Sequence, residues 1–448
     1  MKASFPILVT DEGSVTTFNA RQSSNALEIR MADPLQPLPE PVRKDPQKKT
    51  RSALVPPLAR SRLGMRLGAQ AARGRFHLQH CDSCEVIVWP PREACPSCLS
   101  DLQWRAANPH GRLIAETTLE TSPELYFRER VPWRVGTVKL ASGVPVMAHL
   151  HAHCRVGDRV ELRLFLDKAD RAVFMAFADT NSPDLREDIQ LRELTNDPRH
   201  RRVLITDARS PAGVALAAAM TDAGAKTVFA GVAESWKRDA AIERLEGMNR
   251  VSVVPLDLTD TRSVEELCGE IGGKVDILVH NAEHVRPGGV MTGRGIADAK
   301  QLHDKLVFGF MRLAENFGPV MRSRGADGVN SATAWVNLLS VYAHANWPAY
   351  GQHSAAHAAV LSLAQCLRGE MLGSGVRVIN TFAGPLEQDW HDSVLPPKVT
   401  PERLARDIVA GLLAGQQDLY IGDVARDVAE RFEDDAKLLE MELAGGGQ

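Results

Sequence analysis

From Arg201 to about residue 435, short apolar runs alternate with longer amphipathic stretches. Runs of this length are typical of buried strands, and the stretches between them are long enough for helices. We therefore expect strands at 203–206, 226–230, 251–256, 275–279, 335–340 and 376–380. Because strands that alternate with helices assemble into a parallel sheet covered on both faces, the pattern predicts a doubly wound α/β domain over 201–435.

A different pattern, with apolar and polar residues alternating at a period of two, occupies the second part of residues 61–178. This period is typical of half-buried strands. It predicts several short strands, among them 111–119, 133–140, 144–150 and 157–162. Short strands at this spacing commonly close on themselves, so the segment predicts a small β-barrel.

The remaining segments carry no such period. Residues 1–60 contain many prolines and are predicted to be an irregular extension. Residues 179–200 are polar and are predicted to be a linker, and residues 436–448 a flexible tail. Basic residues crowd between Arg43 and Arg75, where a phosphate or an acidic partner surface would find a contact. A solvated flexible arm explains the same crowding.

Composition narrows the class of protein. The chain has 448 residues, 24% of them charged, and a net charge of -3, which gives no general attraction to nucleic acid or membranes. No run approaches the roughly 18 apolar residues of a membrane-spanning helix. The apolar run Phe5–Val9 is too short for the core of a signal peptide. A cytoplasmic location is therefore expected.

Four of the seven cysteines form two Cys-x-x-Cys pairs, Cys81 with Cys84 and Cys95 with Cys98. Each pair presents two thiolates from one tight turn, and four soft thiolates suit tetrahedral zinc. A redox pair and an iron–sulfur cluster are the alternatives. Because no further polar ligand stands out, the zinc would be structural. The other cysteines, at 154, 268 and 366, are interpreted as ordinary small apolar residues.

Residues 74–178 resemble the zinc-ribbon and OB-fold family found beside acyl-CoA thiolases, acetyltransferases and the aldolases of steroid side-chain breakdown. The resemblance lies in the order of the cysteine pairs around Trp-Pro-Pro-Arg (89–92), then Gly-Arg-Leu (111–113) and Arg-Val-Gly-Asp-Arg-Val (155–160). It implies a domain that docks on a thiolase-like or acyltransferase-like subunit and helps to hold acyl-CoA. Basic and aromatic residues do not interleave along this barrel, which argues against nucleic acid.

The second half resembles the short-chain dehydrogenase/reductase family, a Rossmann fold, over about 201–425. The matching features are the strand order, Asn281-Ala282 after the fourth strand, Ser340, Tyr350 and Ala383-Gly384-Pro385. The resemblance implies NAD(P) as the cofactor. By position in the motif, the residues that would meet it are Thr206, Arg209, Gly213, Asp257 and Asn281.

The cofactor loop departs from the family pattern Thr-Gly-x-x-x-Gly-x-Gly. Asp207 and Pro211 stand where two glycines are expected, and Glu283 replaces the glycine of Asn-Ala-Gly. Asp207 and Glu283 add negative charge near the phosphates, and Pro211 removes a backbone donor. Arg209 is a candidate to offset Asp207. These departures argue against tight binding of NAD(P), although Asn281 is expected to keep its role of bridging strands.

The catalytic set that the resemblance implies is also incomplete. Ser340 and Tyr350 match the serine and tyrosine, but Ser354 stands where the family's lysine would be and Leu306 where its asparagine would be. A lysine lowers the pKa of the tyrosine from about 10, and each unit of that shift is a factor of about ten. Ser340 and Tyr350 are therefore interpreted as vestigial. His353, one helical turn after Tyr350, is the candidate substitute for the missing cation.

Two functions fit these observations. The first is an accessory subunit in acyl-CoA metabolism, which docks a thiolase-like or acyltransferase-like partner and uses the Rossmann domain for substrate channelling or for pairing. Pairing through the long helices would join it to an active dehydrogenase subunit or to a second copy. The alternative is an active NAD(P)-dependent 3-hydroxyacyl-CoA dehydrogenase or 3-ketoacyl-CoA reductase.

Overall fold

A computed structural model describes residues 36–38, 40, 55–57, 61–178, 185–291, 295–325, 331–388, 391–392 and 394–445. Leu35–Gln448 form one compact unit. The predicted extension 1–60 and the first part of the basic segment lie almost wholly outside the described residues. At the end of that segment, Arg73 and Arg75 pair with Glu433 at 3.4 and 2.8 Å, so these two cations already have an acidic partner within the chain.

The described chain begins with a helix and a three-stranded antiparallel sheet. Helix α1 (Arg62–Ala72) is capped by Ser61, whose hydroxyl accepts a hydrogen bond from Gly64 N at 3.0 Å. The sheet has the order β2-β1-β3. Its strands are β1 (His77–Cys81), β2 (Val86–Val88) and β3 (Gln103–Ala106). This small sheet carries the cysteines in its turns.

A closed barrel of order β4-β5-β6-β8-β7 follows. Its strands are β4 (His110–Leu119), β5 (Trp133–Leu140), β6 (Pro145–Leu150), β7 (Arg159–Leu166) and β8 (Ala172–Ala178). A short helix, α2 (Leu125–Arg128), joins β4 to β5. The alternation in the sequence places Leu113, Val138 and Leu162 inside, where each is at most 1% exposed. The predicted small barrel is confirmed.

The segment predicted as a linker is partly helical. It contains a 3-10 turn, Leu185–Glu187, and α3 (Ile189–Leu194), which Asp188 caps by accepting from Leu191 N at 2.8 Å. Glu193 of α3 accepts hydrogen bonds from Tyr126 at 2.9 Å and from Lys168 at 2.6 Å. The polar residues of this stretch thus bind the barrel, because opposite charges and donors on the barrel face them.

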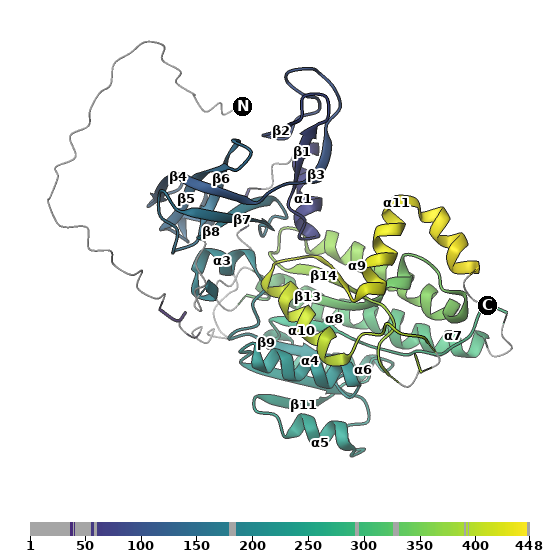
Figure 1. Cartoon of the computed structure of the whole chain (residues 1–448). Helices are drawn as coiled ribbons and strands as arrows, with labels where there is room; N and C mark the ends of the chain where they lie inside the picture. The colour runs from purple at the N-terminus through teal and green to yellow at the C-terminus, as the bar shows by residue number, and fades with distance from the viewer. Residues whose placement is uncertain are drawn as a thin grey trace, which may run out of the picture. The chain divides into compact units, whose positions relative to one another are not determined.

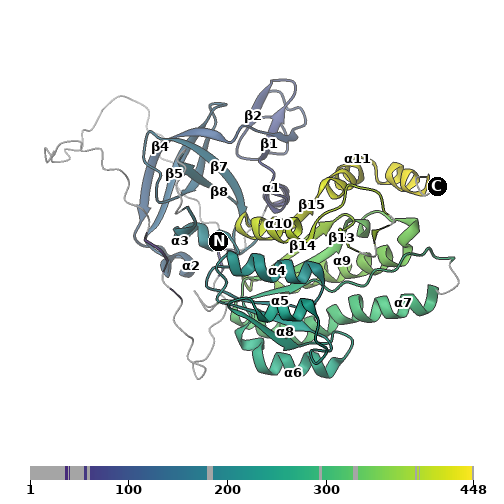
Figure 2. The ribbon, with the colours of Figure 1, turned by 60° about the horizontal axis from the view of Figure 1, so that its bottom comes forward.

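The second half is a seven-stranded parallel sheet of order β11-β10-β9-β12-β13-β14-β15, with helices on both faces (Figures 1 and 2). Its strands are β9 (Arg202–Ile205), β10 (Thr227–Val232), β11 (Val251–Pro255), β12 (Ile277–His280), β13 (Ala334–Ser340), β14 (Arg377–Ala383) and β15 (Asp418–Ile421). The doubly wound fold that the sequence predicts is confirmed.

Two apolar cores lie on the two faces of this sheet. One face is covered by α4 (Pro211–Asp222), α5 (Ala240–Glu246) and α10 (Pro401–Leu413). The other is covered by α6 (Thr261–Ile271), α8 (Gly309–Arg324) and α9 (Gly351–Met371). Helix α7 (Gly295–His303) continues through a π-helical turn, Asp304–Phe308, into α8. This turn is positioned at the carboxyl end of the sheet by contacts described below.

The C-terminal helix α11 runs over Asp423–Gly445, where the sequence predicted a flexible tail from residue 436. The helix is kinked at Asp435, whose φ and ψ are -151° and 97°. Beyond the kink Leu439 is buried as a member of the apolar core that also contains residues of α8 and α9. This burial stabilises a segment whose exposed charged residues suggest a tail. None of the helices in the described residues combines the length and the apolar character needed to cross a bilayer.

Candidate functional site

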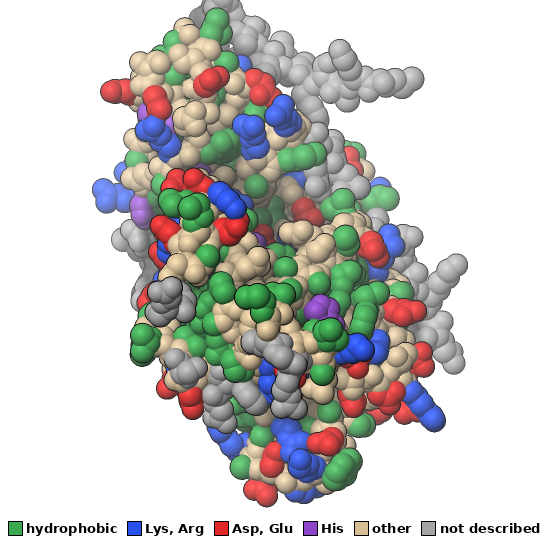
Figure 3. Space-filling model, turned by 90° about the vertical axis from the view of Figure 1, so that its right-hand side faces the viewer, with side chains coloured by type: hydrophobic (Ala, Val, Ile, Leu, Met, Phe, Trp, Pro, Cys, Tyr) green, Lys and Arg blue, Asp and Glu red, His purple; other side chains and the backbone are tan. Residues whose placement is uncertain are grey.

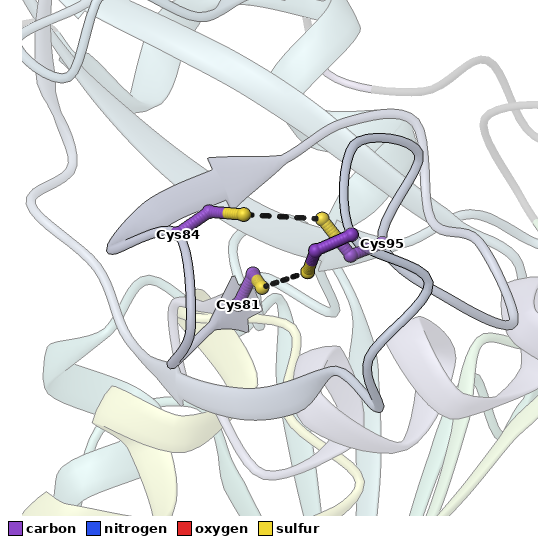
Figure 4. A group of neighbouring side chains, drawn as sticks. Cys81, Cys84 and Cys95 are labelled. Carbon is purple, nitrogen blue, oxygen red and sulfur yellow. Dashed lines mark hydrogen bonds between the residues drawn. The ribbon is translucent and has the colours of Figure 1, made fainter.

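The two Cys-x-x-Cys turns bring four thiols together at one end of the small antiparallel sheet (Figure 4). The residues after each second cysteine, Glu85 and Leu99, adopt left-handed conformations with φ of 55° and 63°. Each turn is therefore followed by a left-handed residue, and the four thiols of the two pairs lie around a common centre. Cys81 and Cys95 are fully buried, and Cys98 is exposed.

The sulfur positions fit a tetrahedral metal site. The four Sγ atoms lie within 4.8 Å of one another, with Cys81 and Cys98 at 3.4 Å and Cys84 and Cys95 at 3.9 Å. A zinc ion bonded to sulfur at about 2.3 Å would hold them about 3.8 Å apart. Four thiolates fill its coordination sphere, so the arrangement is consistent with structural zinc that stabilises the ribbon.

In the parallel sheet, the crevice where a dinucleotide would lie opens at the carboxyl ends of β9 and β12, where the strand order reverses. Asn281 crosses this point. Its Oδ1 accepts from Asp207 N at 3.0 Å and its Nδ2 donates to Asp207 O at 2.8 Å. Thr206 meets Asn281 as well, with its Oγ1 accepting from Asn281 N at 3.3 Å. Asn281 thus joins the two strands through its side chain.

Asp207, which stands in place of a glycine, is neutralised within the protein. Its Oδ2 lies 2.7 Å from Nζ of Lys305, in the π-helical turn before α8. The same oxygen is 3.4 Å from Glu283 N. Arg209 does not offset Asp207 as the sequence suggested, because its Nε binds Asp239 at 2.5 Å. Sequence reasoning missed Lys305. A half-buried aspartate that needs a cation is the signal for such a partner, but it does not identify which one.

The start of α4 is also committed to internal contacts. Ser210 Oγ accepts from Gly213 N at 3.0 Å, and Pro211 offers no N–H. A Cβ on Gly213 would lie 2.2 Å from Asp207 O, so glycine is required here for close packing of loop and helix. Fewer backbone donors therefore face the crevice than in a glycine-rich loop that holds a pyrophosphate. The residues of the loop do not fit a tightly bound dinucleotide.

Glu283 brings a second carboxyl to the crevice. Burial and the charge of Asp207 together raise the pKa of Glu283 to about 7, although a hydrogen bond from Gln388 opposes the shift. Gln388 Nε2 donates to Glu283 Oε1 at 2.6 Å. Asp257, the expected adenine contact, accepts from Thr259 N at 2.9 Å and closes the turn before α6. Within the described residues, the crevice thus brings together the carboxyl groups of Asp207 and Glu283 and the ammonium group of Lys305.

The residues that match the catalytic serine and tyrosine end β13 and precede α9. Ser340 Oγ accepts from Tyr342 N at 3.3 Å. Tyr350 is 3% exposed, and its ring stacks on Trp347 with centroids 4.3 Å apart. Ser354, at the lysine position, donates to Tyr350 O at 3.2 Å and accepts from Trp347 N at 3.2 Å. Ser354 therefore fastens the loop before α9.

The space beside Ser340 is small. It encloses about 30 Å³, room for a water molecule or two, whereas pockets for organic ligands measure about 300 Å³ or more. Its walls include Ser340, Tyr342, Trp347 and Glu283. The ring centroid of Trp347 lies 4.6 Å from that of Tyr342 and 4.3 Å from that of Tyr350. Trp347 thus forms part of the wall of the space beside Ser340.

Several buried histidines surround the same region in their neutral form. His353 packs against His357, with ring centroids 4.3 Å apart, and the imidazole of His391 lies 5.7 Å from the ring of Tyr350. From the sequence, His353 is expected to lie one helical turn after Tyr350. In the structure Tyr350 is the N-cap residue of α9 and His353 lies in the first turn of that helix. Burial lowers the pKa of His357 to about 4 and that of His280 to about 3. Neutral imidazoles do not supply the charge of the missing lysine.

Comparisons with known proteins match three parts of the chain. A family model described as "Enoyl-(Acyl carrier protein) reductase" matches residues 208–419. The model "ChsH2, rubredoxin-like zinc ribbon domain" matches 69–104, and "ChsH2, C-terminal OB-fold domain" matches 104–165.

Curated relatives match the second half. Sulfoacetaldehyde reductase 2 of Chromohalobacter salexigens is 30% identical over 193 residues, 42% of this chain and 73% of that protein. Short-chain dehydrogenase PC-15 of Penicillium crustosum is 28% identical over 162 residues, 34% of this chain. The chain spans about half the length of PC-15, 54%. A solved short-chain dehydrogenase from Burkholderia cenocepacia J2315 in complex with NADP is 26% identical, with TM-score 0.49, and the match covers 54% of this chain and 97% of that one.

The parallel-sheet domain therefore belongs to the short-chain dehydrogenase/reductase family. The whole chain is a fusion in which this domain follows ChsH2-like zinc-ribbon and OB-fold domains.

Proposed function

We propose that this protein is an accessory subunit in acyl-CoA metabolism whose short-chain-dehydrogenase domain does not carry out hydride transfer. The observation that carries the proposal is the pairing of Asp207 with Lys305 at 2.7 Å in the crevice where a pyrophosphate would lie. A dinucleotide would have to displace this pair and approach the Asp207 and Glu283 carboxyl groups. Like charges at such short range oppose binding.

The closed space beside Ser340 supports the same proposal. A substrate carbonyl must approach the hydroxyl that donates its proton within hydrogen-bond distance. Trp347 and Tyr342 line a cavity of only about 30 Å³ at this place. Ser354 stands at the position of the family's lysine and its hydroxyl donates to the backbone carbonyl of Tyr350. This position therefore supplies no positive charge that would stabilise the tyrosinate form of Tyr350. Proton transfer from Tyr350 would therefore be poorly supported.

The ChsH2-like domains support a role beside a thiolase-like or acyltransferase-like subunit, which the barrel and ribbon would dock. Apolar side chains on the face that carries α7 and α11 offer a second contact area (Figure 3), among them Ile296, Leu438 and Met441. A hollow of about 1000 Å³ between α8 and α9, bordered by Met311, Cys366 and Leu372, would accept a second dehydrogenase-type subunit or a copy of this chain.

Titration of the full chain with NADH and with NADPH, followed by nicotinamide fluorescence, tests the proposal. We expect no saturation up to about 1 mM, which corresponds to binding weaker than about 4 kcal/mol. The variant Asp207→Gly/Glu283→Gly removes both carboxyl groups and should bind more tightly than the natural chain. Asp222→Gly, which removes an exposed carboxylate at the far end of α4, is the matched control and should change nothing.

Micromolar binding by the natural chain would contradict the proposal and favour the alternative, an active NAD(P)-dependent 3-hydroxyacyl-CoA dehydrogenase or 3-ketoacyl-CoA reductase. Rapid turnover of a 3-oxoacyl thioester by the purified chain would do the same. Purification from the native host should instead recover the chain together with a thiolase-like or acyltransferase-like subunit.

A further inference from the structure

A cavity of about 430 Å³ lies where three parts of the fold meet, namely β7 and β8 of the barrel, α3, and the C-terminal end of α10. Its volume falls within the range of about 300–1000 Å³ that is typical of small-molecule sites. It is separate from the zinc ribbon cysteines and from the crevice at Asp207, none of which border it. Because one wall is barrel and another is Rossmann domain, neither domain alone would form it.

Buried hydrogen bonds fix these walls relative to one another. Arg377, at the start of β14, donates to the carbonyl oxygen of Leu166 at 2.9 Å and to those of Leu194 and Gly415 at 3.2 Å each. One guanidinium thus binds the barrel, α3 and the loop after α10 together. Gln417 adds a contact to Asp170 of the barrel at 2.8 Å. A cavity with walls held in this way is preformed.

The lining is mainly apolar. Phe165 and Phe177 come from the barrel, and both belong to a small buried cluster that extends to Leu185 and Leu191. Leu413, the last residue of α10, adds a further apolar side chain to the lining. Aromatic and branched side chains of this kind exclude water from an apolar guest and favour its burial.

The charged side chains in the lining are mostly paired already. Arg163 binds Glu161 at 3.1 Å and lies over the ring of Phe177, 4.6 Å from its centroid. Arg186 binds Asp197 through Nε at 3.1 Å and through Nη2 at 2.5 Å. These two arginine–carboxylate pairs carry no net charge, so among the described lining residues one further cation decides the charge of the cavity.

That cation is Arg192. Its Nη2 donates to Arg199 O at 2.9 Å, but its buried Nη1 has no hydrogen-bond partner in the part of the chain that the structure describes. Glu193, the adjacent carboxylate, is taken by Lys168 at 2.6 Å and by Arg130 at 3.1 Å. Arg192 therefore brings to the lining a guanidinium that forms no ion pair within the described residues, and an anion in the cavity would supply one.

We propose that this cavity binds a small organic monocarboxylate, with the carboxylate on Arg192 and an apolar or aromatic body against Phe165 and Phe177. Such a ligand would give the guanidinium of Arg192 an ion partner and would cover the aromatic lining. An arginine in a partly desolvated site binds a carboxylate through charge-assisted hydrogen bonds, and the apolar wall adds affinity without polar specificity. The proposal does not depend on whether the dehydrogenase domain is active.

Calorimetry on the full chain with 4-phenylbutyrate and its primary amide tests the charge requirement. We expect saturable binding of the carboxylate and binding of the amide that is weaker by roughly tenfold or more. Arg192→Met keeps the length of the side chain and should abolish the difference between the two probes. Arg406→Met removes an exposed cation from α10 and is the matched control. This variant should still bind the carboxylate more tightly than the amide.

A steric variant tests the place independently. Ala414 borders the cavity and is exposed, so Ala414→Trp should fill its mouth without disturbing the core, and binding of 4-phenylbutyrate should be lost. Ala410→Trp, one turn earlier on α10 and outside the lining, should bind as the natural chain does. Equal binding of acid and amide, unchanged binding in Arg192→Met and Ala414→Trp, or no binding by the natural chain would each overturn the proposal.

Discussion

The zinc-ribbon site and the crevice of the parallel sheet differ in how much of their expected chemistry the residues retain. At the ribbon, all four cysteines are present and their Sγ atoms lie within 4.8 Å of one another. At the crevice, the strands and Asn281 are in place, but a pair formed by Asp207 and Lys305 occupies the position of a glycine loop.

The difference follows from what each site contributes to folding. The ribbon has only a small core of its own, around Val88 and Leu102, so a metal held by the four cysteines would supply much of its stability. The parallel sheet is held by two large apolar cores on its faces. A domain stabilised in that way would tolerate substitutions in the loop before α4, because burial of side chains and not a ligand holds it together.

The largest effect is expected at the ribbon. Cys81→Ser removes one of four thiolates and should release the zinc and unfold the ribbon, since metal binding there amounts to about 10 kcal/mol in comparable small domains. Metal content by mass spectrometry and the thermal unfolding of the full chain measure this. Cys366→Ser, at an exposed cysteine outside the cluster, is the control. Retention of about one zinc per chain in Cys81→Ser would contradict the ligand assignment.

At the crevice, Lys305→Met should destabilise the parallel-sheet domain by about 1–3 kcal/mol, because it leaves the Asp207 carboxylate without its cation. Adding Asp207→Asn should recover much of that loss. Urea unfolding followed by tryptophan fluorescence gives the coupling from the four variants of the cycle. Lys237→Met, at an exposed lysine, should have little effect. Additive effects of the two changes would show that the pair is not coupled.

The smallest effect concerns Glu283, whose pKa burial raises to about 7. The folded state keeps the proton that the unfolded state releases near its usual pKa, about 4.3. The contribution of Glu283 to stability is therefore complete below that pKa and is lost as the pH rises through 7.

Glu283→Gln, which cannot ionise, should gain stability relative to the natural chain between pH 5 and about pH 6.5, by about 1–2 kcal/mol. Urea midpoints at the two pH values measure the gain, with the exposed Glu430→Gln as the control. A difference that is independent of pH would show that the carboxyl is not buried from water as described.

Local patterns determined much of this protein in advance. The alternation of strands and helices predicted the doubly wound sheet, the period-two alternation predicted the barrel, and the spacing of the cysteine pairs predicted the four-thiol cluster. These three predictions were confirmed because each depends on residues that are close together in the sequence. Their periodicity or turn geometry acts over only a few positions. The end of the last helix was missed because burial of Leu439, a tertiary contact, holds the segment beyond residue 435.

Which side chains meet was decided by tertiary structure alone. Lys305 and Asp207 lie 98 positions apart in the sequence, and the pairing of Arg209 with Asp239 left Asp207 to Lys305. The cavity at Arg192 likewise forms only where the barrel and α10 lie side by side. Arg377 helps to hold them there by donating to a backbone carbonyl of the barrel, and such an acceptor cannot be recognised from the sequence because every residue has one. The sequence by itself specifies elements and local ligand sets, whereas the choice among several possible ionic partners depends on which of them the fold brings within a few ångströms.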